Sequence, residues 1–207
     1  MTTVPRAENP ARPALEGHDL HLGYAAGEDV VAGLDISVDE GSFTVVVGPK
    51  ACGKSTLLRS SNKVLPPRSG TVLLDGREIS SMHPKVFVRQ VGFLAQPRIL
   101  LLDEPTTYLD LAHQVEVLEL CRELNQVLGT TIVAVLHDLN QACRYADRIV
   151  VMGAGRILAR GRPAQVITPQ TIHEAFGLEV CITPDPVTGT PLILPSPPHA
   201  HVHSEGP

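Results

Sequence analysis

The sequence lacks an excess of basic residues. Its 17 lysines and arginines are outnumbered by 22 aspartates and glutamates, which gives a formal net charge of −5 at pH 7. The basic footprint that marks a nucleic-acid-binding surface is therefore missing. Hydrophobic residues make up 43% and charged residues 19% of the 207 residues. This composition favours one globular domain with a sizeable core.

Long apolar runs are also missing. A membrane-spanning helix needs about 18–20 consecutive apolar residues, and no run in the chain approaches that length. The N-terminal residues lack a basic segment followed by an apolar core, so we expect no signal peptide. The four cysteines, which form neither a metal pattern nor a disulfide framework, fit a reducing cytoplasm. They are Cys52, Cys121, Cys143 and Cys181.

What the chain does contain is an alternation of strand and helix patterns, which predicts an α/β domain over residues 17–194. Residues 1–16 are expected to form a loose leader and residues 195–207 a disordered tail. Strands are predicted at 19–23, 30–36, 43–47, 71–74, 99–103, 131–136, 148–152 and 156–159. Helices are predicted at 54–62, 111–128, 138–145 and 169–176.

The octapeptide GPKACGKS at residues 48–55 follows the G-x-x-x-x-G-K-[ST] pattern of a P-loop, or Walker A motif. It lies between the predicted strand 43–47 and a predicted helix, which is the context that a P-loop requires. Backbone N–H groups there surround phosphates, Lys54 is placed to reach the β- and γ-phosphates, and Ser55 to bind magnesium. The alternative, a chance glycine-rich turn, explains neither the spacing nor the context.

Two acidic residues, Asp103 and Glu104, end a second apolar strand. In α/β folds this end of a strand is where ligands bind. Asp103 is expected to hold magnesium through water, and Glu104 to polarise the attacking water as general base, as in a Walker B motif. The alternative is that the two acids cap a helix. The next predicted strand ends in His137, which is either structural or a contact to the γ-phosphate.

These motifs together resemble the ATP-binding subunits of ABC transporters over about residues 17–194. The phrases at 104–114 and 137–147 resemble iron-siderophore importers, with cobalamin importers close to them. The resemblance implies a P-loop NTPase core with a mostly parallel sheet flanked by helices, plus an antiparallel β subdomain. It also implies ATP and magnesium as ligands, His137 as the switch histidine and Gln96 as a residue of the magnesium shell. The nucleotide-binding residues it implies are Tyr24, Gly48, Pro49, Lys50, Ala51, Cys52, Gly53, Lys54, Ser55, Thr56 and Gln96.

Tyr24 has a second possible role, and Ala51 departs from the residue that the family usually has. Tyr24 is expected against the adenine, although an aromatic residue after a strand is also common in plain packing. At Ala51 the family usually has a glycine, often with positive φ. If that conformation is kept, alanine costs about 1 kcal/mol. We therefore expect nucleotide binding to be weakened but not abolished, with the positive charge of Lys50 beside the phosphates as a partial offset.

The helical subdomain and the Leu-Ser-Gly-Gly-Gln signature of the family are missing. Only Pro97 and Arg98 separate Gln96 from Ile99, and no Ser-Gly-Gly run occurs anywhere in the chain. A parallel crossover needs about a dozen residues, so the Q-loop strand and the Walker B strand cannot both keep their family positions. Either residues 91–95 leave the sheet or residues 91–103 form one continuous extended or broken segment. We expect the Walker B strand to stay and Gln96 to be displaced.

Of three functions that a P-loop allows, two are compatible with the other motifs. The first is the ATPase subunit of an iron-siderophore importer, with impaired hydrolysis, bound to the cytoplasmic face of the membrane through permease subunits. The second is a nucleotide-binding module that does not turn over alone. It could act in a homodimer or with an intact ATP-binding subunit. The third, an unrelated P-loop enzyme such as a small-molecule kinase, does not account for Glu104 beside Asp103 together with His137.

Overall fold

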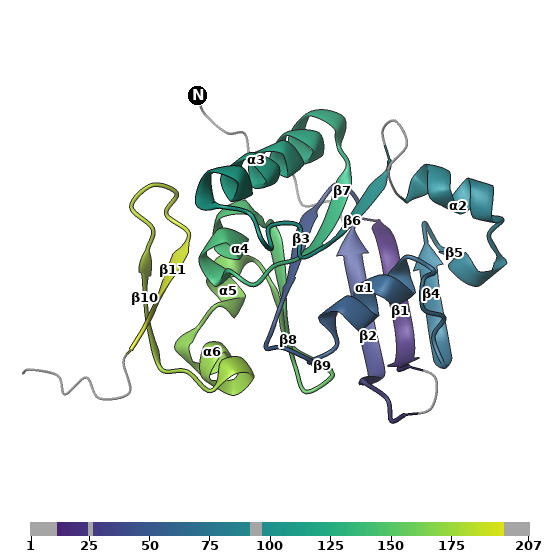
Figure 1. The fold of residues 1–207 in the computed structure, drawn as a ribbon, viewed down its shortest axis with the longest axis horizontal. Helices are drawn as coiled ribbons and strands as arrows, with labels where there is room; N and C mark the ends of the chain where they lie inside the picture. Colours follow the sequence, from purple (N-terminus) through teal and green to yellow (C-terminus); the bar gives the residue numbers. More distant parts are fainter. Residues whose placement is uncertain (1–11, 25–26, 92–96, 197–207) are drawn as a thin grey trace, which may run out of the picture.

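The computed structural model describes residues 12–24, 27–91 and 97–196. The chain forms a five-stranded sheet of order β6-β7-β3-β8-β9, a four-stranded sheet of order β2-β1-β4-β5 and a two-stranded hairpin. Figure 1 shows the four-stranded sheet at one end of the molecule and the hairpin at the other. None of the helices in this described part combines the length and the apolar composition that a membrane span requires.

The five-stranded sheet is the centre of the domain. Strand β3 (Phe43–Val47) is buried at all five positions and pairs in parallel with β7 (Thr131–Val135) and β8 (Arg148–Gly153). Strand β6 (Ile99–Asp103) pairs in parallel with β7, and β9 (Arg156–Gly161) pairs antiparallel with β8. The strands predicted here are confirmed. The short apolar runs of β3 and β7, which are buried at every position, are typical of strands covered on both faces of a sheet.

The four-stranded sheet is antiparallel. It contains β1 (Pro13–Leu22), β2 (Val31–Asp39), β4 (Ser69–Leu74) and the two-residue β5 (Arg77–Glu78). Residues 1–16 were expected to form a loose leader, but β1 begins at Pro13. The prediction is therefore wrong for residues 13–16, the last four of the leader. The physical reason is tertiary: that end of β1 pairs with both β2 and β4, and Leu15 is buried.

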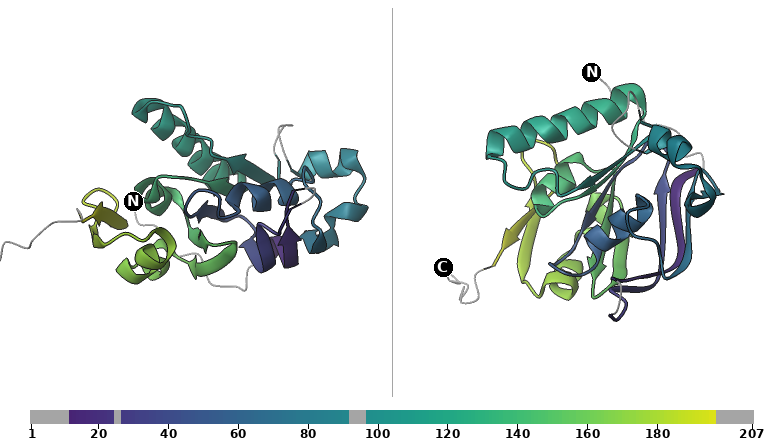
Figure 2. Two further views of the ribbon diagram at one scale, coloured as in Figure 1. Left: turned by 60° about the horizontal axis from the view of Figure 1, so that its bottom comes forward. Right: turned by 45° about the vertical axis from the view of Figure 1, so that its right-hand side comes forward.

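Helices cover the two faces of the central sheet. Apolar residues of α1 (Lys54–Ser61) share one core cluster with the antiparallel sheet and one face of the central sheet. The opposite face packs against α3 (Leu111–Leu128), α4 (Leu139–Tyr145) and α6 (Pro169–Phe176). All four helices were predicted, with ends that differ by one residue at α1 and α4. Figure 2 shows α3 at the periphery of the molecule.

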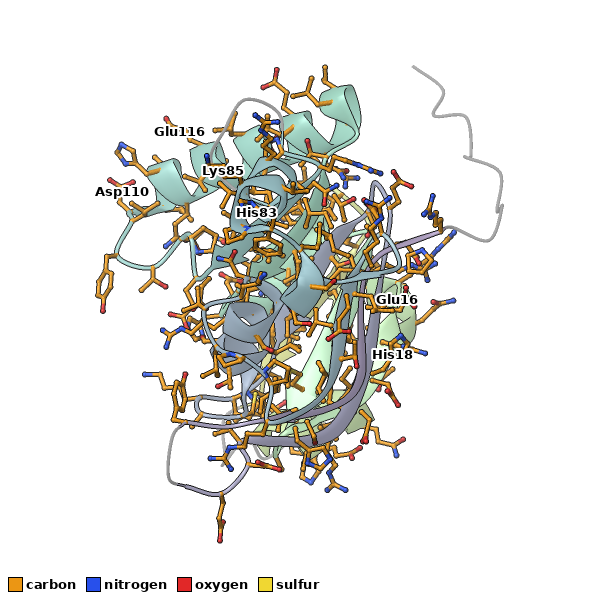
Figure 3. The ribbon with its side chains drawn as sticks, turned by 90° about the vertical axis from the view of Figure 1, so that its right-hand side faces the viewer. Glu16, His18, His83, Lys85, Asp110 and Glu116 are labelled. Carbon is orange, nitrogen blue, oxygen red and sulfur yellow. The ribbon has the colours of Figure 1, made fainter. Side chains whose placement is uncertain are left out.

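Several short elements were not predicted. They are the helix α2 (Pro84–Gln90), the 3₁₀ turn η1 (Ile79–Ser81), the helix α5 (Pro163–Val166) and the hairpin strands β10 (Val180–Pro184) and β11 (Pro191–Pro195). Each is at most seven residues long, so hydrophobic periodicity has little room to show. Figure 3 shows His83 and Lys85 at the start of α2, where His83 accepts a hydrogen bond from the Lys85 backbone N–H at 3.3 Å.

The junction before β6 resolves one of the alternatives. Val91 forms an isolated parallel bridge with Ile99, the first residue of β6. The two residues therefore lie side by side, which excludes the extended form of the alternative over residues 91–103 and leaves a broken segment. The Walker B strand keeps its place in the sheet, as expected. Gln96 lies outside the described residues.

Candidate nucleotide-binding site

Three parallel strands bring the motifs together. Because β6, β7 and β3 are neighbours that run in the same direction, their carboxyl ends meet at one edge of the sheet. Gly48 follows β3, Asp103 ends β6, and His137 follows the residue after β7. Positions up to 89 residues apart in the sequence therefore share one edge.

The P-loop connects β3 to α1 through two glycines that no other residue can replace without movement. A Cβ on Gly48 would lie 2.3 Å from the Met152 carbonyl oxygen, and one on Gly53 would lie 2.5 Å from Val31 Cγ2. Gly53 is the N-cap of α1 in a left-handed conformation, and no side chain caps this helix. The first N–H groups of α1 are thus left for another acceptor, and the helix N-terminus favours an anionic one.

Ala51 has the positive φ expected of the glycine that the family usually has at this position. Its φ is +62°, in the region that disfavours a Cβ by about 1–2 kcal/mol. The loop therefore retains the backbone path of a glycine although it carries an alanine.

Lys54 folds over the P-loop. Only 5% of the residue is exposed, and its Nζ donates to the carbonyl oxygens of Gly48 at 2.9 Å and Pro49 at 2.8 Å. Cys52 is also buried, with its Sγ 3.9 Å from the same Nζ. The ammonium is thus held beside the loop interior by neutral carbonyls, which an anionic ligand would outcompete electrostatically.

Ser55 and Asp103 form the pair predicted to bind magnesium. The Ser55 hydroxyl donates to Asp103 Oδ1 at 2.8 Å, and Arg59 Nε lies 3.9 Å from Oδ2. Within the described residues no group of three or more His, Cys, Asp or Glu side chains is arranged to hold a metal. One hydroxyl and one carboxylate nevertheless fit Mg²⁺, which keeps several waters and takes few protein ligands beside phosphate oxygens.

Glu104 and His137 face each other. His137 Nε2 lies 2.8 Å from Glu104 Oε1, and Thr107 Oγ1 donates to Oε2 at 3.3 Å. The hydrogen bond from His137 lowers the pKa of Glu104, against the opposing effect of partial burial. Glu104 is therefore a carboxylate at neutral pH. Its φ of +52° is a strained value that tends to occur at functional sites.

Neither acid caps a helix, so the capping alternative is wrong. The N-cap of α3 is Asp110, whose carboxylate accepts from the His113 backbone N–H at 2.9 Å. Asp103 and Glu104 instead contact Ser55 and His137.

Tyr24 lies at the entrance of the site. The residue is 49% exposed, and its hydroxyl accepts a hydrogen bond from Arg59 Nη1 at 3.2 Å. Tyr24 is thus not a packed core residue, which favours a role at the surface of the site over plain packing.

Most of these residues line one open cleft of about 650 Å³, whereas the predicted site residues Gly48, Pro49, Cys52 and Asp103 are not among its lining residues. Three residues that line it were not predicted: Val30, Thr107 and Tyr108. A sequence signal existed for two of them, since Thr107 and Tyr108 follow directly on Asp103-Glu104. The predicted residues that line the cleft are Tyr24, Lys50, Ala51, Gly53, Lys54, Ser55, Thr56, Glu104 and His137.

Comparisons with known proteins agree with this arrangement. A family model described as ABC transporter matches residues 31–97. The ferric enterobactin transport ATP-binding protein FepC of Escherichia coli is 34% identical over 255 aligned positions, which cover 87% of this chain and 93% of FepC. The chain belongs to the ATP-binding subunits of ABC transporters. The petrobactin import ATP-binding protein FpuD of Bacillus anthracis is also 34% identical, with 88% and 93% of the two chains covered.

The fold comparison agrees with the α/β architecture described above. The structure of cbiO1 from Clostridium perfringens, part of the ABC transporter complex cbiONQ, matches with a TM-score of 0.69 at 21% identity. The match covers 80% of this chain and 96% of that one. The α/β P-loop fold class and the ABC importer family predicted from the sequence are confirmed. Importer subunits of this family bind ATP and work with membrane permease components.

The alignments also contain more positions than this chain supplies. The FepC alignment has 255 positions, whereas 87% of 207 residues is about 180, so about 75 positions of FepC have no counterpart here. The family match ends at residue 97, two residues before β6.

Proposed function

We propose that this chain is the ATP-binding subunit of an importer for iron bound to siderophores. The names of FepC and FpuD, which refer to ferric enterobactin and petrobactin, support this class of solute. The observation that carries the nucleotide function is that the P-loop, Ser55 and the Glu104–His137 pair line one cleft, with Asp103 bonded to Ser55 at its edge. The subunit would act at the cytoplasmic face of the membrane, attached through its permease.

Each side chain has a proposed role in this site. Lys54 leaves the carbonyls of the P-loop and binds the β- and γ-phosphates, while the N–H groups at the start of α1 surround them. Ser55 and Asp103 would hold Mg²⁺, which supplies positive charge against the phosphate oxygens. Glu104 polarises the attacking water, and His137 orients Glu104 and contacts the γ-phosphate. Tyr24 packs against the adenine.

We also propose that the helical subdomain and the signature loop are missing from this chain. The support is the absence of a Ser-Gly-Gly run, the end of the family match at residue 97 and the roughly 75 unmatched positions of FepC. In the family, the signature loop of a second subunit completes each ATP site and supplies electrostatic stabilisation at the γ-phosphate. Two copies of this chain would lack that group at both sites, whereas pairing with an intact subunit would complete one site.

The second candidate function follows from the missing signature loop. The chain would be a nucleotide-binding partner that does not hydrolyse ATP by itself. Binding and turnover are separable experimentally. Calorimetry with Mg-ATP is expected to show binding, and Lys54→Ala to weaken it at least tenfold, about 1.4 kcal/mol. Among the described residues that line the cleft, Lys54 is the one buried cation. Lys85→Ala on the exposed face of α2 is the matched control and should leave the affinity unchanged (Figure 3).

Phosphate release is the second measurement. The chain alone is expected to release no more phosphate than its Glu104→Gln variant. Mixed with an intact ATP-binding subunit of the same importer, it should gain turnover that Glu104→Gln reduces. Steady turnover by the chain alone that Glu104→Gln abolishes would contradict the binding-only function, and failure to bind Mg-ATP would contradict the nucleotide function itself.

A further inference from the structure

The β1–β2 connection supplies two walls of the nucleotide cleft. Tyr24 follows β1 and Val30 precedes β2, and both residues line the cleft. The Val30 N–H donates to the Leu22 carbonyl at 2.7 Å, which fixes the side that leads into β2. Tyr24 needs a separate anchor, because its ring is half exposed and its hydroxyl bonds only to the exposed Arg59 among the contacts of the described residues.

Arg68, just before β4, supplies that anchor. Its Nη2 donates to the Tyr24 carbonyl oxygen at 2.6 Å, a shorter bond than the 3.3 Å one that the same oxygen accepts from the Gly27 N–H. Its Nη1 donates to Asp29 Oδ1 at 2.9 Å. One rigid guanidinium therefore bonds to both sides of the connection at once. Gly23 leaves room for it, since a Cβ there would lie 2.9 Å from Arg68 Cζ.

Asp29 is itself held in place by His21. His21 Nδ1 lies 2.8 Å from Asp29 Oδ2, so both carboxylate oxygens have a partner. The hydrogen bond from His21, followed by that from Arg68, lowers the pKa of Asp29. The side chains of Arg68, Asp29 and His21 are between 27% and 34% exposed, so water only partly screens the network.

We infer that Arg68 is a positioning residue for the nucleotide base. Through the Tyr24 carbonyl and Asp29 it sets the separation of the Tyr24 ring from Val30, and hence the slot that receives the base. This inference rests on the proposed nucleotide function. Aromatic stacking on a base contributes about 1–3 kcal/mol, and a ring that is free to move loses part of that contribution to the entropy of ordering.

The alternative is a purely structural role for Arg68 in the antiparallel sheet. The two roles predict different ligand dependence. A structural defect weakens every ligand of the cleft, whereas a misplaced Tyr24 weakens only ligands that carry a base. Inorganic tripolyphosphate has the phosphate chain without the base, and it is therefore the informative probe beside ATP.

The experiment measures dissociation constants of Mg-ATP and Mg-tripolyphosphate for the unmodified chain, Arg68→Ala, Tyr24→Ala and the double variant. We expect Arg68→Ala to weaken ATP about tenfold and to leave tripolyphosphate unchanged, and the double variant to match Tyr24→Ala. Arg68→Lys should lose less ATP affinity than Arg68→Ala but more than the unmodified chain, because its ammonium can replace only one of the two contacts of the guanidinium. Arg77→Ala, on an exposed strand of the same sheet, should change neither constant.

Three results would overturn the inference, two of which concern the pattern of losses. One is an equal loss of ATP and tripolyphosphate affinity in Arg68→Ala, and the other is additive losses in the double variant. If Arg68→Ala does not fold, Asp29→Asn provides the same test, since it weakens the hold on Arg68 while keeping the shape of the side chain. An unmodified chain that binds no Mg-ATP overturns the proposed function and the inference together, whereas binding that Arg68→Ala leaves intact overturns the inference alone.

Discussion

At the scale of single residues, the P-loop combines a left-handed backbone with a side chain that disfavours it. Ala51 has φ +62°, and Ala154, in the turn between β8 and β9, has φ +48°. Both alanines adopt a conformation that glycine enters without steric penalty. Of the two, only Ala51 lines the nucleotide cleft. Comparing the same substitution at both positions therefore separates its effect on backbone strain from its effect on ligand binding.

Ala51→Gly is expected to stabilise the domain by about 0.5–1 kcal/mol. Relief of the left-handed strain contributes about 1–2 kcal/mol, and the greater freedom of glycine in the unfolded chain offsets about 0.4–1 kcal/mol. Urea unfolding measures the gain. Ala154→Gly is the matched control and should give a similar gain, while ATP affinity should not fall in either variant. A gain at Ala154 with none at Ala51 would show that the loop is not strained.

At the scale of elements, the β10–β11 hairpin is fastened to α4, the helix that follows His137. Asn140 accepts from the Ile193 N–H at 2.7 Å and donates to the Ile193 carbonyl at 3.3 Å. Arg144 Nε donates to Asp185 Oδ2 at 2.7 Å, and the Asp185 side chain is only 2% exposed. The hairpin is therefore part of the support of the helix beside the candidate site.

This attachment predicts an acid-sensitive stability. The hydrogen bond from Arg144 is the main cause that lowers the pKa of Asp185 from its ordinary value of 3.8. A carboxylate with a lowered folded pKa contributes stability that is fully present above its ordinary pKa and is lost as the pH falls through the folded pKa. Asp185→Asn should therefore lower the melting temperature at pH 7, and the difference from the unmodified chain should shrink below about pH 4.

Thermal unfolding across this pH range measures the effect. Glu174→Gln, on an exposed position of α6, is the control and should leave the pH profile unchanged. A difference between Asp185→Asn and the unmodified chain that is the same at all pH values would show that packing, and not the charge of Asp185, fastens the hairpin.

At the scale of the whole molecule, α3 exposes apolar side chains along one side. Leu120, Leu124 and Val127 follow the spacing of a helical seam; Leu120 is 55% and Val127 72% exposed, and Leu124 between them is half-buried. The opposite side of α3 packs on the central sheet through the fully buried Leu118. Figure 3 shows Glu116, from the first half of α3, pointing away from the body of the molecule.

We predict that this seam makes the purified chain associate with increasing concentration, because contiguous exposed apolar surface favours contact between molecules. Leu120→Lys with Val127→Lys should reduce the association, as measured by light scattering over a concentration series, with little change in melting temperature. Leu118→Ala is the contrasting variant and should destabilise the fold by about 2–5 kcal/mol. A chain that stays monomeric throughout, with or without the lysines, would contradict the prediction.

The sequence allowed most of the central sheet and its site to be predicted. Strands β3, β6 and β7 are short apolar runs, and each is followed by residues of a recognisable motif. Topological rules for parallel strands then place those residues at one edge. The N-terminal part of β1 and the hairpin were not predicted, because their pairing partners lie elsewhere in the chain and their proline-rich composition disfavours strands locally.

What the sequence by itself determined was the chemistry of the cleft: a lysine and a serine after a glycine loop, two acids after a strand and a histidine after the next. Local patterns suffice there, because strand, loop and helix signals are read from neighbouring residues. Only the tertiary structure decided that Lys54 rests on the P-loop carbonyls, that His137 bonds to Glu104 and that Arg68 holds Tyr24 from 44 positions away. Such contacts join residues that are far apart in the sequence and depend on how the sheets pack. No pattern of neighbouring residues encodes them.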